Sequence, residues 1–204
     1  RYFCLKFKTM STAAPETAEK IYTVAEWLDL EKSAELRHEY YYGKLIPMAG
    51  EAKRANIIAG NIRRILDGSL YEKGFHIFDH DIKAEVVPDG IYRYPDLVVA
   101  SITDEEDEYI VKHPVMLVEI ASEGSGQRDR VKKLREYLDV PSLWYYFIVA
   151  QDDMLAELHT RDSDGRWTQR YFTESDEMIE LPQFELRFPL AAIYARLKEI
   201  SLPK

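Results

Sequence analysis

Two short apolar runs, each carrying one carboxylate, mark the centre of the hydrophobic pattern. The first spans residues 94–100 with Asp96 near its start, and the second spans residues 115–121 with Glu119 after four apolar residues. Both are rich in β-branched and aliphatic residues and have the length of a strand. Inside a strand buried on both faces, Glu119 must be paired, protonated or metal-bound. If the two strands are neighbours, their carboxylates form an acidic pocket for a divalent cation.

Three segments carry helix signals. Thr23 and Glu26 have the spacing of a capping box, so a helix is expected from Thr23 to about Leu36. In residues 52–71 the apolar positions recur at helical spacing, which predicts a long amphipathic helix. Residues 127–138 predict a third helix, because a Val-Pro pair follows and stops it.

Strand signals occupy the stretches between these helices. Residues 39–48 predict a hairpin that turns at Gly43, and residues 75–87 alternate as one strand. A strongly apolar strand is expected at 143–149. The remaining expected elements are strands at 154–160 and 167–172, which form a meander covering one side, and a closing helix at 190–197.

Length and charge narrow the class of protein. The 204 residues can bury a substantial core, and 46% hydrophobic with 31% charged content is ordinary for a globular protein. We expect residues 1–20 to be a disordered or extension segment and residues 21–204 to form a single domain. The net charge of −9 argues against a protein that coats nucleic acid through a basic surface, but it does not exclude a nuclease.

The compartment follows from what the sequence lacks. No apolar run reaches membrane-spanning length, and the pattern of a signal peptide is absent, so no membrane association is expected. The single Cys4 permits no internal disulfide, which fits a reducing, cytoplasmic setting.

Six blocks of sequence, in a fixed order, carry a family resemblance. They are RHEY at 37–40, GKLIPM at 43–48, YPDLV at 94–98, VEIAS at 118–122, DRVKK at 129–133 with Tyr137, and VPSLWY at 140–145. Together they resemble successive blocks of the Uma-two family of restriction-endonuclease-like proteins, within the PD-(D/E)XK nuclease superfamily. The resemblance runs from about Tyr22 to Leu197, nearly the whole chain.

The resemblance implies both a fold and a reaction. The implied fold is α/β: a restriction-endonuclease-like core with a central mixed β-sheet flanked by helices, an N-terminal helix and hairpin, and a C-terminal β-meander. The implied reaction is Mg²⁺-dependent (or Mn²⁺-dependent) endonuclease hydrolysis of DNA, with a cation that stabilises phosphoryl oxygens and activates water. Hard cations take oxygen ligands, so Asp96, Glu119 and the backbone carbonyl of Ile120 are the expected metal ligands.

The lysine that assists the water departs from the superfamily's pattern. The pattern places it two residues after the glutamate, where this chain has Ala121. In the resembling family it lies on the following helix, at Lys133, which shares one stripe with Asp129 and Tyr137. The expected apolar face of that helix, beside this stripe, is made by Val131, Leu134 and Leu138. A solvated Lys133 is the alternative interpretation, and Lys132 is the local competitor.

Two further carboxylates, and a second class of function, remain open. Glu39 and Asp81 match acidic positions of the family blocks, where each could add a carboxylate or, as we prefer, a structural hydrogen bond. The alternative function is a catalytically inactive nuclease-fold protein that binds nucleic acid or protein. A Lys133 ammonium that points away from Asp96 and Glu119 would favour it. The abundant tyrosines predict core and interface positions, so a homodimer is expected, which would suit cutting both strands of a duplex.

Overall fold

The computed structural model describes residues 20–48, 50–79, 81–103, 107–122 and 127–197, and the residues before 20, including the expected N-terminal extension, lie outside this description. The elements in chain order are α1 (Val24–Glu31), β1 (His38–Tyr41), β2 (Lys44–Pro47), α2 (Lys53–Leu70), η1 (Tyr71–Lys73), β3 (Phe75–Asp79), β4 (Lys83–Val87), β5 (Ile91–Arg93), β6 (Leu97–Ser101), β7 (Ile110–Val111), β8 (Pro114–Ala121), α3 (Gln127–Leu138), β9 (Tyr145–Ala150), β10 (Ala156–Arg161), β11 (Trp167–Phe172), β12 (Met178–Leu181), η2 (Pro182–Phe184), β13 (Leu186–Pro189) and α4 (Leu190–Ile193).

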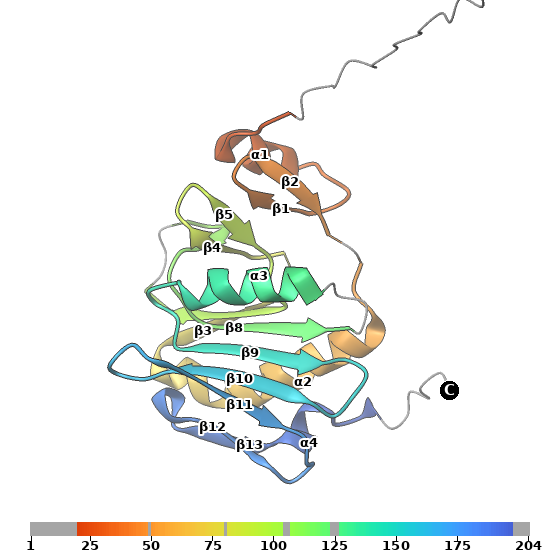
Figure 1. Cartoon of the computed structure of the whole chain (residues 1–204), viewed down its shortest axis with the longest axis vertical. Helices are drawn as coiled ribbons and strands as arrows, with labels where there is room; N and C mark the ends of the chain where they lie inside the picture. The colour runs from red at the N-terminus through yellow and green to blue at the C-terminus, as the bar shows by residue number, and fades with distance from the viewer. Residues whose placement is uncertain (1–19, 49, 80, 104–106, 123–126, 198–204) are drawn as a thin grey trace, which may run out of the picture.

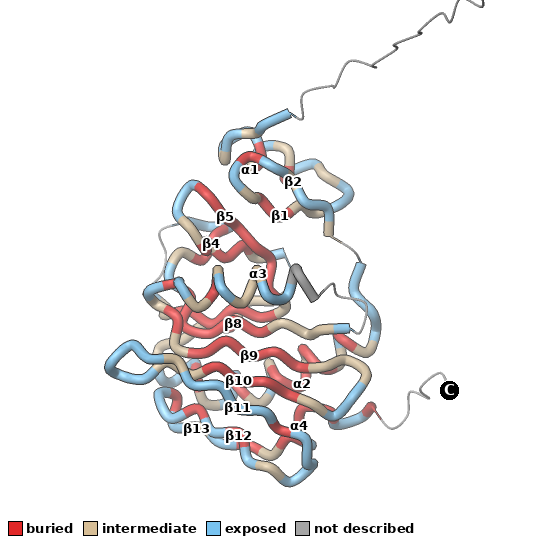
Figure 2. The backbone as a smooth tube through the Cα atoms, viewed as in Figure 1, coloured by how far each residue is buried: buried red, intermediate tan, exposed pale blue. Residues whose placement is uncertain are grey.

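A six-stranded mixed sheet forms the body of the molecule (Figure 1). Its order is β11-β10-β9-β8-β6-β3, with β8 and β9 parallel and the other neighbours antiparallel. On one face, Ile58 and Ile62 of α2 pack against strand residues such as Val118. On the other face, Tyr137 of α3 packs against Leu117 and its neighbours. Figure 2 shows the resulting buried centre of the sheet, and the predicted α/β fold is confirmed.

The helix predicted at residues 52–71 is α2, which is amphipathic. It has 18 residues, and its buried residues recur on one face at Ile58, Ile62, Leu66 and Leu70. Among the described residues, no helix is both long enough and apolar enough to cross a membrane.

A second, five-stranded sheet has the order β2-β1-β5-β4-β7 and lies above α3 in Figure 1. It explains why the prediction of one strand at residues 75–87 was wrong. That stretch is two strands, of which β3 pairs with β6 in the large sheet and β4 pairs with β5 in the small one. The alternation in the sequence does not mark the break, and burial does not follow it: β3 fully buries only Ile77, whereas β4 buries the adjacent Lys83 and Ala84. Asp81 therefore lies between the two sheets.

Several boundaries also differ from the prediction. The first helix ends at Glu31 rather than near Leu36, and the closing helix α4 covers only Leu190–Ile193. The strand expected at 94–100 begins at Leu97, so Asp96 directly precedes it. The predicted meander exists as β9-β10-β11, but it extends the large sheet at its edge, because β10 pairs with β9 along five residues.

The N-terminal unit consists of α1, β1 and β2, and its two strands form one end of the small sheet. The predicted capping box is present, since Thr23 Oγ1 accepts from the Glu26 N–H at 3.2 Å and Glu26 Oε2 accepts from the Thr23 N–H at 2.8 Å. The hairpin turns through Tyr42 (φ 44°) and Gly43 (φ 86°), the left-handed pair of a tight hairpin. The Tyr42 N–H donates to the Gly90 carbonyl at 2.7 Å, which joins this turn to the β4–β5 turn.

Candidate functional site

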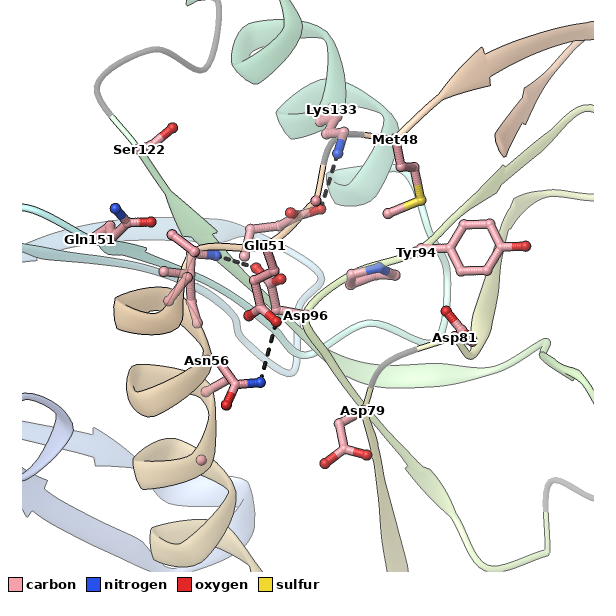
Figure 3. Close-up of a pocket in the computed structure, with 18 residues that line it drawn as sticks. Met48, Glu51, Asn56, Asp79, Asp81, Tyr94, Asp96, Ser122, Lys133 and Gln151 are labelled. Carbon is pink, nitrogen blue, oxygen red and sulfur yellow. Dashed lines mark hydrogen bonds and ion pairs between the residues drawn. The ribbon is translucent and has the colours of Figure 1, made fainter. Parts of the chain in front are cut away.

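One cleft of about 540 Å³ opens where the start of α2, the start of β6, the end of β8 and the middle of α3 meet (Figure 3). Its polar lining residues are Glu51, Asn56, Asp79, Asp81, Asp96, Glu119, Ser122, Lys133 and Gln151. Asp96, Glu119, Lys133 and Asp81, all singled out in the sequence, thus share one cleft, and Ile120 lines it as well.

Asp96 and Glu119 lie next to each other because their strands are antiparallel neighbours. Leu97 of β6 pairs with Val118 of β8, so the next position sets Asp96 opposite Glu119. The Ile120 N–H donates to Asp96 Oδ2 at 2.5 Å and ties that side chain to the end of β8. Strand alternation directs both carboxylates to the sheet face that α3 covers.

Burial and mutual proximity change the ionisation of this pair. The pKa of Asp96 is raised to about 7, first by burial and then by the negative charge of Glu119. Burial also raises the pKa of Glu119, against the opposing effects of the Lys133 charge and of the Tyr137 hydrogen bond. Two like charges that share a partly buried site favour a cation between or beside them.

Lys133 reaches the pair from α3. Its Nζ lies 3.4 Å from Glu119 Oε1 and 3.1 Å from Glu39 Oε1. Burial alone would lower the pKa of Lys133, but the charges of Glu119 and Glu39 outweigh burial and raise it. The side chain is only 17% exposed, which contradicts the alternative of a solvated lysine. Ala121, at the position where the superfamily's pattern has a lysine, packs into the apolar cluster between α3 and the sheet. The positive charge comes from Lys133 on the facing helix instead.

Lys132, the competing lysine, points elsewhere. Its Nζ lies over the ring of Tyr41, 3.2 Å from the centroid, and 3.9 Å from Glu136 Oε1. Its side chain is 40% exposed, and it does not line the cleft. Of the two neighbouring lysines, only Lys133 contacts Glu119 among the described ion pairs.

Tyr137 of α3 orients Glu119 through a hydrogen bond. Its hydroxyl donates to Glu119 Oε1 at 2.8 Å, and its fully buried ring packs edge-on against Tyr146. Burial and the charge of Glu119 raise the pKa of Tyr137, so it stays a neutral donor. The prediction that Val131 belongs to the buried face was wrong, because Val131 is 47% exposed and the stripe of Lys133 and Tyr137 turns toward the sheet.

A network of buried ion pairs extends from Lys133. Glu39 of β1 pairs through Oε2 with Arg93 Nη1, and Arg93 Nη2 lies 2.7 Å from Glu136 Oε2 on α3. Arg93 is 0% exposed, so it depends on both carboxylates for compensation. Glu39 does not line the cleft but bridges Arg93 and Lys133. Sequence reasoning missed Arg93, whose signal was a lone charge at the end of the short strand Ile91–Arg93.

Three other acidic residues line the cleft, namely Glu51, Asp79 and Asp81. Asp79 forms an ion pair with Arg63 at 2.5 Å. Asp81 forms an ion pair with Arg37 at 2.9 Å and its side chain is 65% exposed. Glu51, which sequence reasoning missed, accepts from Asn56 at 3.3 Å, and its charge contributes to the raised pKa of Asp96. Figure 3 shows Glu51 close to Asp96 and Asp81 at the other end of the cleft.

The family comparison matches these blocks to a known group of proteins. The sequence model of the Uma2 family, described as "Putative restriction endonuclease", matches residues 24–192. The chain belongs to the Uma2 family. The resemblance identified from the sequence is thereby confirmed, and it covers the whole of the cleft described above.

Relatives and a solved structure extend this match. The Uma2 chain is 27% identical to "Uncharacterized protein slr1290" of Synechocystis sp. over 173 residues, 84% of this chain and 90% of that protein. It is 28% identical to "Uncharacterized protein sll1609" of the same organism over 152 residues, 72% and 85% of the two chains. A crystal structure from Anabaena variabilis, described as "a putative nuclease belonging to DUF820", matches with a TM-score of 0.70 at 17% identity, over 85% of this chain and 98% of that one. The chain therefore shares the fold of that protein.

Nucleases of the restriction-endonuclease-like kind generally use a divalent metal ion, and the residues of this cleft fit one. Within the described residues, no three His, Cys, Asp or Glu side chains form a ligand cluster. Asp96 and Glu119 instead form a pair of carboxylates on neighbouring strands. Mg²⁺ characteristically takes one or two carboxylates and completes its shell with water and substrate phosphate. Lys133 is shared between Glu119 and Glu39, and Asp96 has no basic partner within ion-pair distance in the described part of the chain. This excess negative charge is what a divalent cation would neutralise.

Proposed function

We propose that this Uma2 protein is a Mg²⁺- or Mn²⁺-dependent endonuclease that hydrolyses phosphodiester bonds of DNA. The observation that supports it most is the partly buried pair of Asp96 and Glu119 with the Lys133 ammonium 3.4 Å from Glu119, in a cleft of about 540 Å³. A carboxylate pair and a lysine in one cleft are the groups that metal-assisted phosphodiester hydrolysis needs.

The carboxylates and one backbone carbonyl would hold the cation. Bound there, a divalent cation would stabilise charge on the phosphoryl oxygens and lower the pKa of the attacking water. Asp96 is oriented by the Ile120 N–H through Oδ2, and Glu119 is oriented by Tyr137 through Oε1. Asp96, Glu119 and the carbonyl of Ile120 would be the ligands, and Asp96 Oδ1 and Glu119 Oε2 are the oxygens that these two hydrogen bonds leave for the cation.

Lys133 acts as a fixed positive charge. Because Glu119 and Glu39 raise its pKa, the side chain is protonated at neutral pH and donates hydrogen bonds rather than accepting a proton. An ammonium group held in advance beside the carboxylates can orient the attacking water and oppose the charge that develops on the phosphate. The shorter contact to Glu39 keeps the ammonium in place before substrate binds.

The alternative is an inactive nuclease-fold protein that binds nucleic acid or protein. It predicts a lysine that points away, or carboxylates too far apart to share a cation. The register that sets Asp96 opposite Glu119, and the contact between Lys133 and Glu119, favour the enzyme instead.

The proposal extends to assembly and setting. We propose a homodimer, because a second site related by two-fold symmetry would serve the second strand of a duplex. The exposed Tyr42 and Tyr109, 57% and 58% accessible, are available for such an interface. The lone Cys4 accords with a cytoplasmic protein. If light scattering gives the molar mass of a monomer, the dimer is contradicted, and the assignment of the cleft is unaffected.

The test is cleavage of supercoiled plasmid and of single-stranded DNA with Mg²⁺ or Mn²⁺. Wild type is compared with D96N, K133A and K132A, all purified in the same way. Lys132 is the matched control, because it is the adjacent lysine and lies over Tyr41 instead of in the cleft. We expect D96N and K133A to lose at least a hundredfold in rate and K132A to stay within about threefold of wild type, since general charge stabilisation contributes on this scale.

The outcomes separate the hypotheses. Equal cleavage by all variants would point to a contaminating nuclease and reject the assignment of the cleft. Loss in K132A but not in K133A would move the lysine's role to the neighbouring residue. A wild type that cleaves neither substrate with either metal would reject the DNA endonuclease.

A further inference from the structure

Helix α3 carries positive charge beside an acidic cleft, in a chain whose net charge is −9. Its basic residues are Arg128, Arg130, Lys132, Lys133 and Arg135, against Asp129 and Glu136. Basic side chains beside the cleft of an acidic protein complement a phosphate backbone, and they would supply the local attraction that the overall charge opposes. Of these residues, Lys133 lines the cleft and Arg130 lines a hollow next to it.

A second, smaller hollow adjoins the cleft at Lys133. It is lined by Glu119, Ile120, Ala121, Arg130, Lys133, Tyr146 and Ile148, and its volume is about 80 Å³. Glu119, Ile120 and Lys133 line both spaces, so the two adjoin at these residues. One water molecule needs only about 10–15 Å³, so the hollow admits a larger group.

Arg130 is the additional cation of this hollow, and a buried carboxylate holds it. Its Nη2 pairs with Glu157 Oε2, where the Glu157 side chain is 6% exposed and the Arg130 side chain is 41% exposed. Glu157 is fixed in turn, because its Oε1 contacts His159 Nε2 at 2.7 Å and accepts from Gln169 Nε2. A fixed, partly exposed guanidinium therefore stands at the rim of the hollow.

Glu157 is ionised, as its pairing with Arg130 requires. Burial would raise the pKa of Glu157, but the hydrogen bond from His159 and the charge of Arg130 outweigh burial and lower it. Glu157 is thus a carboxylate throughout the neutral range. A guanidinium has five N–H donors, and the described contact with Glu157 uses Nη2 alone. Because Arg130 is already ordered, an incoming anion does not have to immobilise it.

We propose that Arg130 binds a phosphate of the DNA strand next to the phosphate held at the Asp96 and Glu119 cleft, and that Glu157 positions its guanidinium. The inference rests on the proposed nuclease function, and it adds to that function a substrate-binding site on the far side of Lys133. Arg130 and Lys133 lie three residues apart, on one side of α3, and both line the hollow that adjoins the cleft. A strand that passes from the cleft along α3 therefore meets Lys133 first and Arg130 second.

The test is binding of fluorescein-labelled duplex and single-stranded DNA, followed by fluorescence anisotropy with Ca²⁺ in place of Mg²⁺. R130Q is compared with R135Q, which removes the same charge from an exposed position of the same helix that lines neither space. We expect R130Q to weaken binding about tenfold and R135Q about twofold or less. Loss of one phosphate contact should also lower the slope of log K against log salt by about 0.9 for duplex or about 0.7 for single strands.

Folding is controlled by a double variant. R130Q alone leaves the buried Glu157 without its cation, so a loss of stability could imitate a loss of binding. R130Q/E157Q removes both charges, so no unpaired buried charge remains. We expect this double variant to melt close to wild type in circular dichroism and still bind DNA weakly. E157Q alone keeps Arg130 but removes the carboxylate that positions its guanidinium. We therefore expect weaker DNA binding with an unchanged salt slope. Binding by E157Q as tight as wild type would remove the positioning role of Glu157.

Cleavage measured in parallel distinguishes this proposal from the nuclease proposal. Equal binding by R130Q and R135Q while wild type cleaves would overturn the phosphate site and leave the nuclease intact. A selective effect of R130Q on binding without any cleavage by wild type would support the phosphate site and reject the nuclease. A wild type that binds neither DNA would overturn the phosphate site.

Discussion

Glu39 Oε1 lies 3.1 Å from the Lys133 ammonium, closer than Glu119 Oε1 at 3.4 Å. Glu39 belongs to β1 of the N-terminal unit, whereas Lys133 belongs to α3. The second oxygen of Glu39 pairs with Arg93, which is fully buried and also bound by Glu136. The N-terminal unit thus takes part in fixing the lysine of the proposed active site.

This contact predicts that E39Q lowers activity as well as stability. The substitution removes the closest negative charge from Lys133 and one of the two carboxylates that compensate Arg93. We expect cleavage to fall about tenfold or more, since misplacement of a charge-stabilising group has effects of this order. The loss is measured as the rate of plasmid cleavage, at a temperature well below the melting point of each variant.

E136Q is the matched control for this prediction. Glu136 compensates the same Arg93, but no described contact joins it to Lys133. We expect E39Q and E136Q to lower the melting temperature by comparable amounts, because each leaves a buried arginine with one carboxylate. Only E39Q should reduce cleavage at matched folded fraction. Equal losses of activity in the two variants would show that Glu39 acts through stability alone.

Binding of Mg²⁺ should raise the melting temperature of the wild type. A ligand that binds only the folded state stabilises it by about 2.7 kcal/mol at one hundred times its dissociation constant. D96N and E119Q should lose this shift because each removes a proposed ligand. K133A should keep the shift although it loses cleavage, since removal of a cation leaves the carboxylates in place. Differential scanning fluorimetry at constant ionic strength measures it, and an equal shift in every variant would indicate a general salt effect.

Because the pKa of Asp96 is raised, D96N should be more stable than wild type, and the difference should depend on pH. Folding raises the pKa from about 3.9 in the unfolded chain to about 7. The folded state therefore binds more protons between these values, and the stability that protonated Asp96 provides falls as pH rises through this window. Without metal, D96N should exceed wild type by about 2 kcal/mol above pH 7, discounted for partial exposure. The difference should shrink as pH falls toward about 4.

Urea unfolding in the presence of EDTA at pH 5 and pH 8 measures this difference. D67N is the control, because Asp67 lies on an exposed position of α2 and keeps its carboxylate in water in both states. A D96N advantage that does not grow between the two pH values would contradict the raised pKa.

The candidate site could be predicted as far as local pattern specifies it. Asp96 and Glu119 each interrupt an apolar strand run, and neighbouring strands bring such residues together, so their proximity follows from the hydrophobic pattern and the block order. The helix expected from about Gln127 to Leu138 is α3, and its end could be predicted because the Val-Pro stop signal is local. Its buried face was predicted less well, since Tyr137 is amphipathic and its burial depends on having Glu119 as a hydrogen-bond acceptor.

The second sheet could not be predicted from these patterns. Alternation across residues 75–87 is the same whether one strand or two are present, and only the pairing partners separate β3 from β4. The contact between Glu39 and Lys133 depends on how the small sheet packs against α3, which local periodicity does not encode. The Arg130 site is of the same kind, because Glu157 comes from β10 at a distant point of the chain.

The last prediction concerns the proposal that residues 21–204 form a single domain. One apolar cluster contains Ile91 of the small sheet together with Leu117 and Tyr146 of the large sheet, so the two should unfold together. In the N-terminal unit, Trp27 is fully buried and its Nε1–H donates to the His38 carbonyl at 2.8 Å.

Trp27→Ala should therefore destabilise the whole domain and not only its N-terminal unit. Removing a fully buried tryptophan costs about 3–5 kcal/mol, and the loss should appear as a shift of one cooperative transition. Tryptophan fluorescence and far-ultraviolet circular dichroism should give coincident urea curves for wild type, and coincident curves at lower urea for the variant. If the wild-type curves separate instead, the N-terminal unit that carries Glu39 folds independently of α3. Trp27→Phe, which keeps most of the apolar volume, should shift both curves less.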